Sequence, residues 1–323
     1  MRSPTLATAL ALAASTGVVT TGQLIAAGCS PRLADRQVRA GHWQRPARSV
    51  YVPHVRALTG LDLGRAAAAL AGGRVVVSGL VACRELGLRW VPDSSGVLAL
   101  VDPTVRTPSS GRVVLRRTQG LGDVPTWRRA GIELAHAPRA VVDAGRELRS
   151  LRDVRGVVLG AVADGWVDVE TLHAALARTQ RNGSGLTRRA VRDAARGCAS
   201  PPEAELVDAL VGCGVPFYVN PQLLLHGRLL GSPDIWLPGL GIGGEVDSVE
   251  RHEEDDHGVE STYDRHERMT QPGLELVHLS VRRIRRDPGE AARHLLARAA
   301  GRSALRQPEP PGLVVVPRGP LLR

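Results

Sequence analysis

The sequence of 323 residues contains no lysine, so all 42 of its basic side chains are arginines. Against 32 acidic residues they leave a formal net charge of +10. Such an excess indicates a polyanionic partner, but arginine codons are GC-rich, and a GC-rich genome would also raise the count. The charge total alone therefore does not identify the partner.

Cysteine pairs and long apolar runs are also missing. The four cysteines are scattered, with no CxxC spacing, which predicts neither a zinc site nor a disulfide framework and favours a reducing cytoplasm. No run approaches the ~18 apolar residues of a membrane span, so we expect no membrane partner. Residues 1–15 have the charge and apolar pattern of a signal peptide, but we expect them to form the first helix of a folded module.

Residues 1–56 have the pattern of a winged helix-turn-helix domain. Apolar residues recur at helical spacing over residues 6–13. A second helix is predicted from Thr21, as its N-cap, to residue 27, and a third from Ser30 to Gly41. Two short strands around an arginine-rich turn, residues 42–52, would form the wing.

This first segment holds seven arginines and a single acid, Asp35. Helical spacing places three of the arginines on one face of the third helix, and two more lie in the wing. The segment therefore predicts a partner of double-stranded DNA, with a helical domain whose basic face is merely solvated as the alternative. The candidate DNA-binding residues are Arg32, Arg36, Arg39, Arg45 and Arg48.

Residues 57–196 predict a middle α/β domain. Four short β-branched runs bounded by glycine and proline indicate a small sheet, with a helix between the first two runs and four helices after the last. Its lone histidines, His136 and His173, have no catalytic spacing.

Residues 197–300 predict an α/β sandwich. A helix over residues 202–211 carries Glu203 in its first turn, and three strands, a helix, a strand and a closing helix follow. Residues 301–323 form a proline-rich tail, which we expect to be mobile.

Three carboxylates mark the predicted strands of this last domain. Alternation along a strand puts Glu245 and Asp247 on one face, and Asp234 lies on the preceding strand. Carboxylates so close repel one another unless a divalent cation binds them, and hard oxygen ligands favour Mg²⁺. Such an ion would polarise a phosphodiester, and Glu203 would add a fourth carboxylate. Acidic side chains on a solvated hairpin are the alternative.

The same residues resemble the PD-(D/E)XK nuclease motif, with Pro233-Asp234 followed after ten residues by Glu245-Val246-Asp247. An aspartate stands in place of the usual lysine. The helix, strands and following His252 are similar to very-short-patch-repair-like endonuclease domains common in actinobacteria. The resemblance implies catalytic roles for Asp234, Glu245, Asp247, His252 and Glu203, with the first three as Mg²⁺ ligands.

The stretch from Gly17 to Val52 resembles the winged-helix domain of AbiEi-type antitoxins of type IV toxin–antitoxin systems. Two later stretches, "VSGLVACRELGL" and "APRAVVDAGREL", look like the middle segments of actinobacterial proteins that join such a domain to the nuclease-like one. In those relatives the first stretch often reads S-H-x-x-A, whereas here Gly79 stands in place of the histidine. The resemblance covers nearly the whole chain.

Together these patterns predict an α+β multidomain protein: an N-terminal winged helix-turn-helix, a middle α/β domain and a C-terminal PD-(D/E)XK-like α/β sandwich. Two functions remain open. One is a DNA-binding regulator with a metal-dependent endonuclease domain. The other is a non-enzymatic transcriptional regulator or antitoxin in which the nuclease fold is degenerate. Either would bind an operator, such as that of a cognate toxin gene, and a homodimer would match palindromic half-sites.

Overall fold

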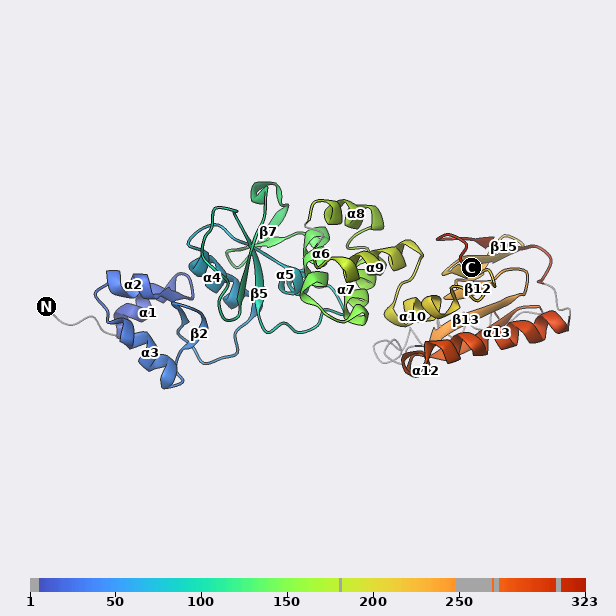
Figure 1. The fold of residues 1–323 in the computed structure, drawn as a ribbon, viewed down its shortest axis with the longest axis horizontal. Coiled ribbons are helices and arrows are strands. Elements are labelled where there is room, and N and C mark those ends of the chain that lie inside the picture. Colours follow the sequence, from blue (N-terminus) through green and yellow to red (C-terminus); the bar gives the residue numbers. More distant parts are fainter. Residues whose placement is uncertain (1–5, 180–181, 248–268, 270–272, 306–308) are drawn as a thin grey trace. The chain divides into compact units, whose positions relative to one another are not determined.

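The computed structural model describes residues 6–179, 182–247, 269, 273–305 and 309–323. The chain divides into two compact units, Met1–Thr187 and Arg188–Arg323, and its described residues form helices and four sheets (Figure 1). The α+β multidomain prediction is therefore confirmed at this level. Among the described helices, none has the length and apolar character needed to cross a membrane.

The N-terminal part of the first unit contains three helices and a three-stranded antiparallel sheet of order β1-β3-β2. Its elements are α1 (Leu6–Ala14), β1 (Val19–Thr20), α2 (Thr21–Ala26), α3 (Pro31–Arg39), β2 (Gln44–Ala47) and β3 (Val50–Val52). Leu24, Ala34, Trp43 and Tyr51 are buried in the core between them. The helices thus lie where the sequence predicts them.

The start of α2 differs by one residue from the prediction. Thr20, not Thr21, is the N-cap, and its hydroxyl accepts a hydrogen bond from the backbone N–H of Gln23. The Gln23 side chain accepts a hydrogen bond from the backbone N–H of Thr20 in return. This reciprocal capping box needs a glutamine three residues after the cap, which Thr20 has and Thr21 lacks.

The rest of the first unit is a five-stranded mixed sheet of order β6-β5-β4-β8-β7 with helices around it. Its elements are α4 (Gly60–Ala71), β4 (Val76–Ser78), α5 (Gly79–Leu86), β5 (Val97–Val101), β6 (Val113–Arg117), the 3-10 turn η1 (Leu121–Asp123), β7 (Thr126–Arg129), β8 (Ile132–Ala135), α6 (Ala137–Glu147), α7 (Leu151–Ala163) and α8 (Val169–Ala177). Helix α9 (Gly185–Ala195) spans the boundary between the two units. The four predicted strands and five predicted helices are present. Helix α4 and strand β7 were not predicted.

A buried polar network joins β4, β6 and α6. Asp143 is fully buried and accepts hydrogen bonds from the Ser78 hydroxyl (2.8 Å), from Arg116 (2.9 Å) and from Arg139 (2.7 Å). Two guanidinium groups and a hydroxyl therefore compensate the buried carboxylate, as burial of a charge requires.

Glu147 occupies the space that a side chain at position 79 would need. Its carboxylate accepts a hydrogen bond from the backbone N–H of Leu80 at the start of α5 (2.8 Å), and a Cβ on Gly79 would lie only 1.7 Å from Glu147 Oε1. Gly79 also has a φ of +66°, which disfavours other residues. Gly79 thus makes room for Glu147. Burial raises the pKa of that carboxyl to about 7.

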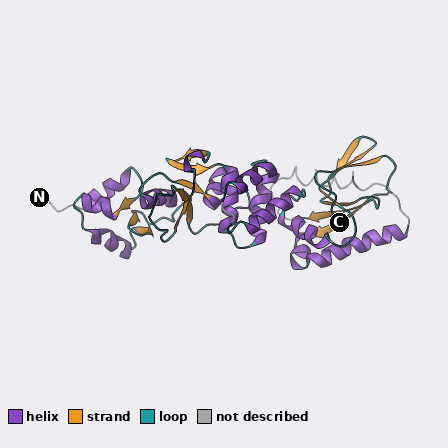
Figure 2. Ribbon diagram, turned by 45° about the horizontal axis from the view of Figure 1, so that its top comes forward, coloured by secondary structure: helices purple, strands orange, loops and turns teal. Residues whose placement is uncertain are grey.

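The second unit has two sheets, of order β14-β13-β12-β9 and β11-β10-β15. Its elements are α10 (Pro201–Leu210), β9 (Tyr218–Val219), β10 (Gln222–Leu225), β11 (Arg228–Gly231), β12 (Ile235–Leu237), β13 (Ile242–Asp247), β14 (Glu275–Ser280), α12 (Val281–Arg286), α13 (Pro288–Ala304) and β15 (Leu313–Val316). Helices α10, α12 and α13 pack on one another, and the long α13 runs along one side of the strands (Figure 2). Five strands take the place of the first three predicted.

The predicted mobile tail is instead part of the second sheet, so that expectation was wrong. Strand β15 pairs antiparallel with β10, and Phe217 pairs with Leu322. Leu313 and Val315 pack against the buried cluster around Trp236. Proline content alone predicted a mobile chain, whereas the alternating apolar residues gain burial once the segment reaches a distant strand.

Candidate functional site

Helix α3 has one buried side and one arginine side. Ala34 is fully buried, and Leu33 and Val38 pack on the same core. Ser30 and Pro31 start the helix where the sequence places them, although the Ser30 side chain makes no capping hydrogen bond. The polar face is therefore held outward by the burial of the apolar one.

The basic face of α3 consists of Arg32, Arg36 and Arg39, which are all exposed. Their positions at i, i+4 and i+7 put them on one side of the helix. Within the residues that the structure describes, none of the three has an ion-pair partner. Three guanidinium groups are thus available for an external anion.

The two arginines of the β2–β3 hairpin, which the sequence predicts to be a wing and which is called the wing below, are also exposed, but their surroundings differ. Arg45 Nη1 lies 3.5 Å from Asp35 Oδ1, and the Tyr51 hydroxyl donates a hydrogen bond to the same carboxylate oxygen (3.1 Å). The Arg48 guanidinium has no ion-pair partner in the described part of the chain. Arg45 is therefore partly neutralised, whereas Arg48 presents its full charge.

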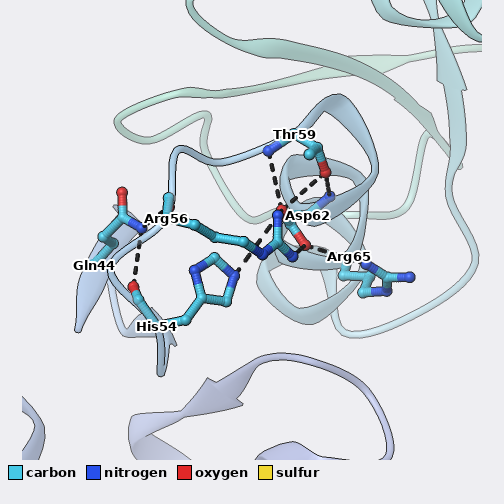
Figure 3. Close-up of polar contacts among 6 residues, drawn as sticks. All are labelled: Gln44, His54, Arg56, Thr59, Asp62 and Arg65. Atoms are coloured by element: carbon cyan, nitrogen blue, oxygen red, sulfur yellow. Dashed lines mark hydrogen bonds and ion pairs between the residues drawn. The ribbon is translucent and has the colours of Figure 1, made fainter. Parts of the chain in front are cut away.

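The wing is anchored at its base by Gln44 of β2. The Gln44 side-chain amide donates hydrogen bonds to the backbone oxygens of His54 (3.0 Å) and Arg56 (2.7 Å), as Figure 3 shows. His54 Nε2 in turn lies 4.0 Å from Asp62 Oδ2. One amide thus ties the wing strand to the segment that leads into α4.

Asp62 connects this segment to α4. Its carboxylate receives two hydrogen bonds from Arg56 (2.9 and 3.1 Å), one from Arg65 (3.2 Å) and two from the N-cap residue Thr59 (Figure 3). Burial would by itself raise the pKa of Asp62, but the hydrogen bonds from Thr59 and Arg56 outweigh it and hold the pKa below its usual value. The base of the wing and the start of α4 are therefore fastened together by a charged, capped contact.

The acidic hairpin brings Asp234 and Glu245 side by side. Asp234 directly precedes β12, whose first residue, Ile235, is paired with Gly244, the neighbour of Glu245 on β13. Asp234 Oδ2 also accepts a hydrogen bond from the backbone N–H of Val246 (2.6 Å), and Glu245 is only 7% exposed.

Asp247, the third carboxylate of the predicted set, contacts a residue that sequence reasoning missed. Its two oxygens lie 3.0 and 3.1 Å from Nδ1 of His278, on the parallel neighbour β14. Both side chains are more than two-fifths exposed. The parallel register of β13 and β14 is the only signal that joins these residues, and it is not visible in the local sequence.

Glu203 holds local structure together. It is 5% exposed, and its carboxylate accepts hydrogen bonds from the Ala199 N–H (2.9 Å), the Ser200 hydroxyl (2.8 Å) and the Asn220 amide (2.8 Å). These bonds occupy three of the roughly four acceptor sites of the carboxylate and tie the N-terminus of α10 to the strand region.

The carboxylates of the predicted metal site meet the ligand requirements of Mg²⁺ only in part. Asp234 and Glu245 supply adjacent hard oxygen ligands. Among the residues that the structure describes, however, no group of three or more His, Cys, Asp or Glu side chains could hold a metal ion. The predicted catalytic residue His252 lies outside the described residues.

Comparison with known protein families gives a match in the N-terminal segment. Residues 8–54 match the model of a family described as "Transcriptional regulator, AbiEi antitoxin". That match covers α3 and both wing strands, and it supports a DNA-binding regulator. No curated protein matches the chain.

One solved structure shows a weak similarity. The crystal structure of the RV2827C protein from Mycobacterium tuberculosis is 20% identical over 61% of this chain and 77% of that chain, with a TM-score of 0.38.

Proposed function

We propose that this protein is a transcriptional regulator of the AbiEi antitoxin type that binds double-stranded DNA through a winged helix-turn-helix formed by residues 6–52. The order of elements supports this, because α1, β1, α2 and α3 are followed by the β2–β3 hairpin as a wing. In helix-turn-helix domains the recognition helix lies in the major groove, a position that α3 would take here. The match to an AbiEi antitoxin family model over residues 8–54 agrees with it.

The observation that carries the proposal is the exposed arginine face of α3. Its three arginines have no acidic partner in the described part of the chain, and the only acid on the helix, Asp35, is engaged by Tyr51 and Arg45. Phosphates would replace water around these guanidinium groups and release condensed counterions. A cognate toxin operator would be the natural target, and a homodimer would match two half-sites.

The test is a salt titration of duplex binding by the full chain with Arg32, Arg36 and Arg39 changed to Ala. If all three contact phosphates, the slope of log K against log salt should fall by about 2.7. Loss of preference for operator over random DNA would assign base reading to α3, and a uniform loss only backbone contact. Arg106→Ala and Arg178→Ala, exposed arginines elsewhere in the first unit, are the controls. An unchanged affinity and slope in the folded triple variant would reject α3 as the recognition element.

A second candidate function is a Mg²⁺-dependent DNA endonuclease in the C-terminal unit. The observation that favours it is the hydrogen bond from the backbone N–H of Val246 to Asp234, which holds the Asp234 carboxylate beside the strand that carries Glu245 and Asp247. There Mg²⁺ would polarise a phosphodiester. No lysine exists in the chain to complete the usual nuclease motif, so a non-enzymatic regulator remains the alternative.

Thermal unfolding of the full chain with and without millimolar Mg²⁺ or Mn²⁺ tests this site. The full chain is needed because β15 completes the second sheet of this unit. Binding should raise the melting temperature by linkage, and Asp234→Asn should abolish the rise and any DNA cleavage. A rise without cleavage favours the regulator, and the absence of any rise with either ion rejects the metal site.

A further inference from the structure

The tip of the wing and a loop of the middle sheet region form an open cleft of about 280 Å³. Arg45, Ala47 and Arg48 line it from the β2–β3 hairpin, and Ser110 and Gly111 line it from the loop before β6. More than sixty residues of sequence separate the two sides. The family match ends at residue 54, so it does not include the second side.

Direct hydrogen bonds hold the two sides together. The backbone N–H of Arg112 donates to the oxygen of Pro46 (2.8 Å), and the backbone N–H of Arg48 donates to the Ser110 hydroxyl (2.9 Å). Gly111 permits this approach, because a Cβ there would lie 2.3 Å from the Pro46 oxygen and its φ is +57°. The loop therefore fixes the position of the wing tip.

The wing is thus held at both ends. At its base Gln44 bonds to the segment that Arg56 fastens to Asp62, and at its tip the loop contacts Pro46 and Arg48. A hairpin restrained in this way keeps its arginines in one place before any ligand arrives. Such preorganisation lowers the entropy lost on binding.

The chemistry of the cleft suits a phosphodiester. Arg48 has no ion-pair partner among the described residues, and Arg45 adds a second guanidinium group. The Ser110 hydroxyl accepts from Arg48 N and retains a proton to donate. No acidic residue lines the cleft. A guanidinium fork and a hydroxyl donor are the groups that bind phosphate oxygens in protein–DNA interfaces.

We infer that this cleft binds a backbone phosphate of duplex DNA, so that the 110–112 loop belongs to the DNA interface together with the wing. The inference rests on the proposed function, since it takes the winged helix as the DNA-binding element. It goes further by assigning a phosphate site that the winged helix alone does not contain. Without the loop, the site would lose its hydroxyl donor and the support of its arginines.

The experiment measures duplex binding by the full chain over a range of salt concentrations for Arg48→Ala, Ser110→Ala and Gly111→Ala. Arg48→Ala should weaken binding roughly tenfold and lower the salt slope by about 0.9, the value for one phosphate contact. Gly111→Ala leaves the charge unchanged but forces the wing tip away, so it should cause a similar loss. The double variant of Arg48 and Gly111 should be no weaker than either single one, because both remove the same contact.

Two controls match these changes. Arg106→Ala removes an exposed arginine from the same loop region, and Gly122→Ala adds a methyl group where nothing lies within 4 Å. Both should bind DNA as the wild type does. Melting temperatures identify any variant that fails to fold, and Ser110→Ala, the mildest change, keeps the test valid if Gly111→Ala does not fold.

The outcomes separate this inference from the proposed function. If the triple α3 variant loses affinity while Ser110→Ala and Gly111→Ala bind normally, the shared site is wrong and the winged-helix proposal stands. If Arg48 and Gly111 effects simply add, the loop and wing do not form one site, and the inference is likewise overturned. Inorganic phosphate at equal ionic strength should compete only weakly in the wild type. Strong competition that Arg48→Ala abolishes would assign the cleft to free phosphate and overturn the assignment to DNA.

Discussion

The arginines on the exposed face of α3 and two arginines of α12, Arg283 and Arg286, have the same side chain and opposite surroundings. Arg36 and its neighbours on α3 have no acidic partner in the described part of the chain. In the C-terminal unit, Arg283 and Arg286 both contact Glu290 (3.0 and 2.8 Å). Hydrogen bonds from these two arginines hold the pKa of Glu290 below its usual value.

The difference separates two uses of one residue type. An arginine whose charge is met by a carboxylate within the chain stabilises local structure and gains little from a phosphate. An arginine without such a partner keeps its capacity to bind one. The overall charge of +10 does not distinguish these cases, but the pairing does. Asp143, fully buried between two arginines, is the extreme of the first class.

The largest expected effect is the loss of stability when the buried carboxylate of Asp143 is removed. Asp143→Ala should destabilise the protein by about 3–5 kcal/mol, because it leaves the poorly exposed Arg116 and Arg139 without their carboxylate. Urea unfolding measures it. The control is Asp93→Ala, whose side chain is 99% exposed beside Arg84 and should change little. Equal, small losses in both variants would show that the buried arginines need no acid.

A second prediction concerns Glu147, a buried acid that hydrogen-bonds a backbone N–H. Burial raises its pKa from 4.5 to about 7. The folded state therefore binds the proton more tightly, and this contribution to stability is complete below pH 4.5 and is lost as the pH rises through 7. The wild type should lose on the order of 2–3 kcal/mol between pH 4.5 and pH 8 relative to Glu147→Gln.

Urea unfolding of both proteins at several pH values measures this difference. The comparison with Glu147→Gln cancels the titration of all other groups. Curves for wild type and variant that run parallel across this range would contradict the buried position of Glu147.

The smallest expected effect is the change in DNA affinity when the paired arginines, Arg283 and Arg286, are removed. The double variant Arg283→Ala and Arg286→Ala should bind duplex DNA with the affinity and salt slope of the wild type, because the Glu290 carboxylate holds both guanidinium groups within the chain. The triple α3 variant measured alongside it should lose both. A drop in slope of about 1.8 in the double variant would place α12 in the interface and end the contrast between the two regions.

Much of the proposed DNA-binding segment was predictable, because its signals are local. The Ser30-Pro31 start of α3 and the spacing of its arginines lie within a few residues of one another. Helical periodicity then fixes which side faces the core. The one-residue error at Thr20 arose because two adjacent threonines offer the same hydroxyl, and only the position of Gln23 decides between them.

The candidate acidic site was predictable only in part. Strand alternation places Glu245 and Asp247 on one face, but the contact of Asp247 with His278 depends on a parallel pairing across thirty residues. Glu203 looked like a fourth ligand from its position in a helix. The bond from Asn220, which engages its carboxylate, depends on how the chain returns to the helix.

The sequence by itself determined where the helices of the first segment lie and that this segment holds seven arginines and a single acid. It also determined the side of α3 on which three of these arginines lie. Capping, periodicity and charge act over one or two helical turns, so they can be recognised without the fold. Only the tertiary structure decided that β15 joins β10, that Glu147 fills the space beside Gly79 and that Gly111 reaches the wing at Pro46. Each of these contacts closes a long loop of chain, and its free energy depends on burial and hydrogen bonds between positions that no local pattern connects.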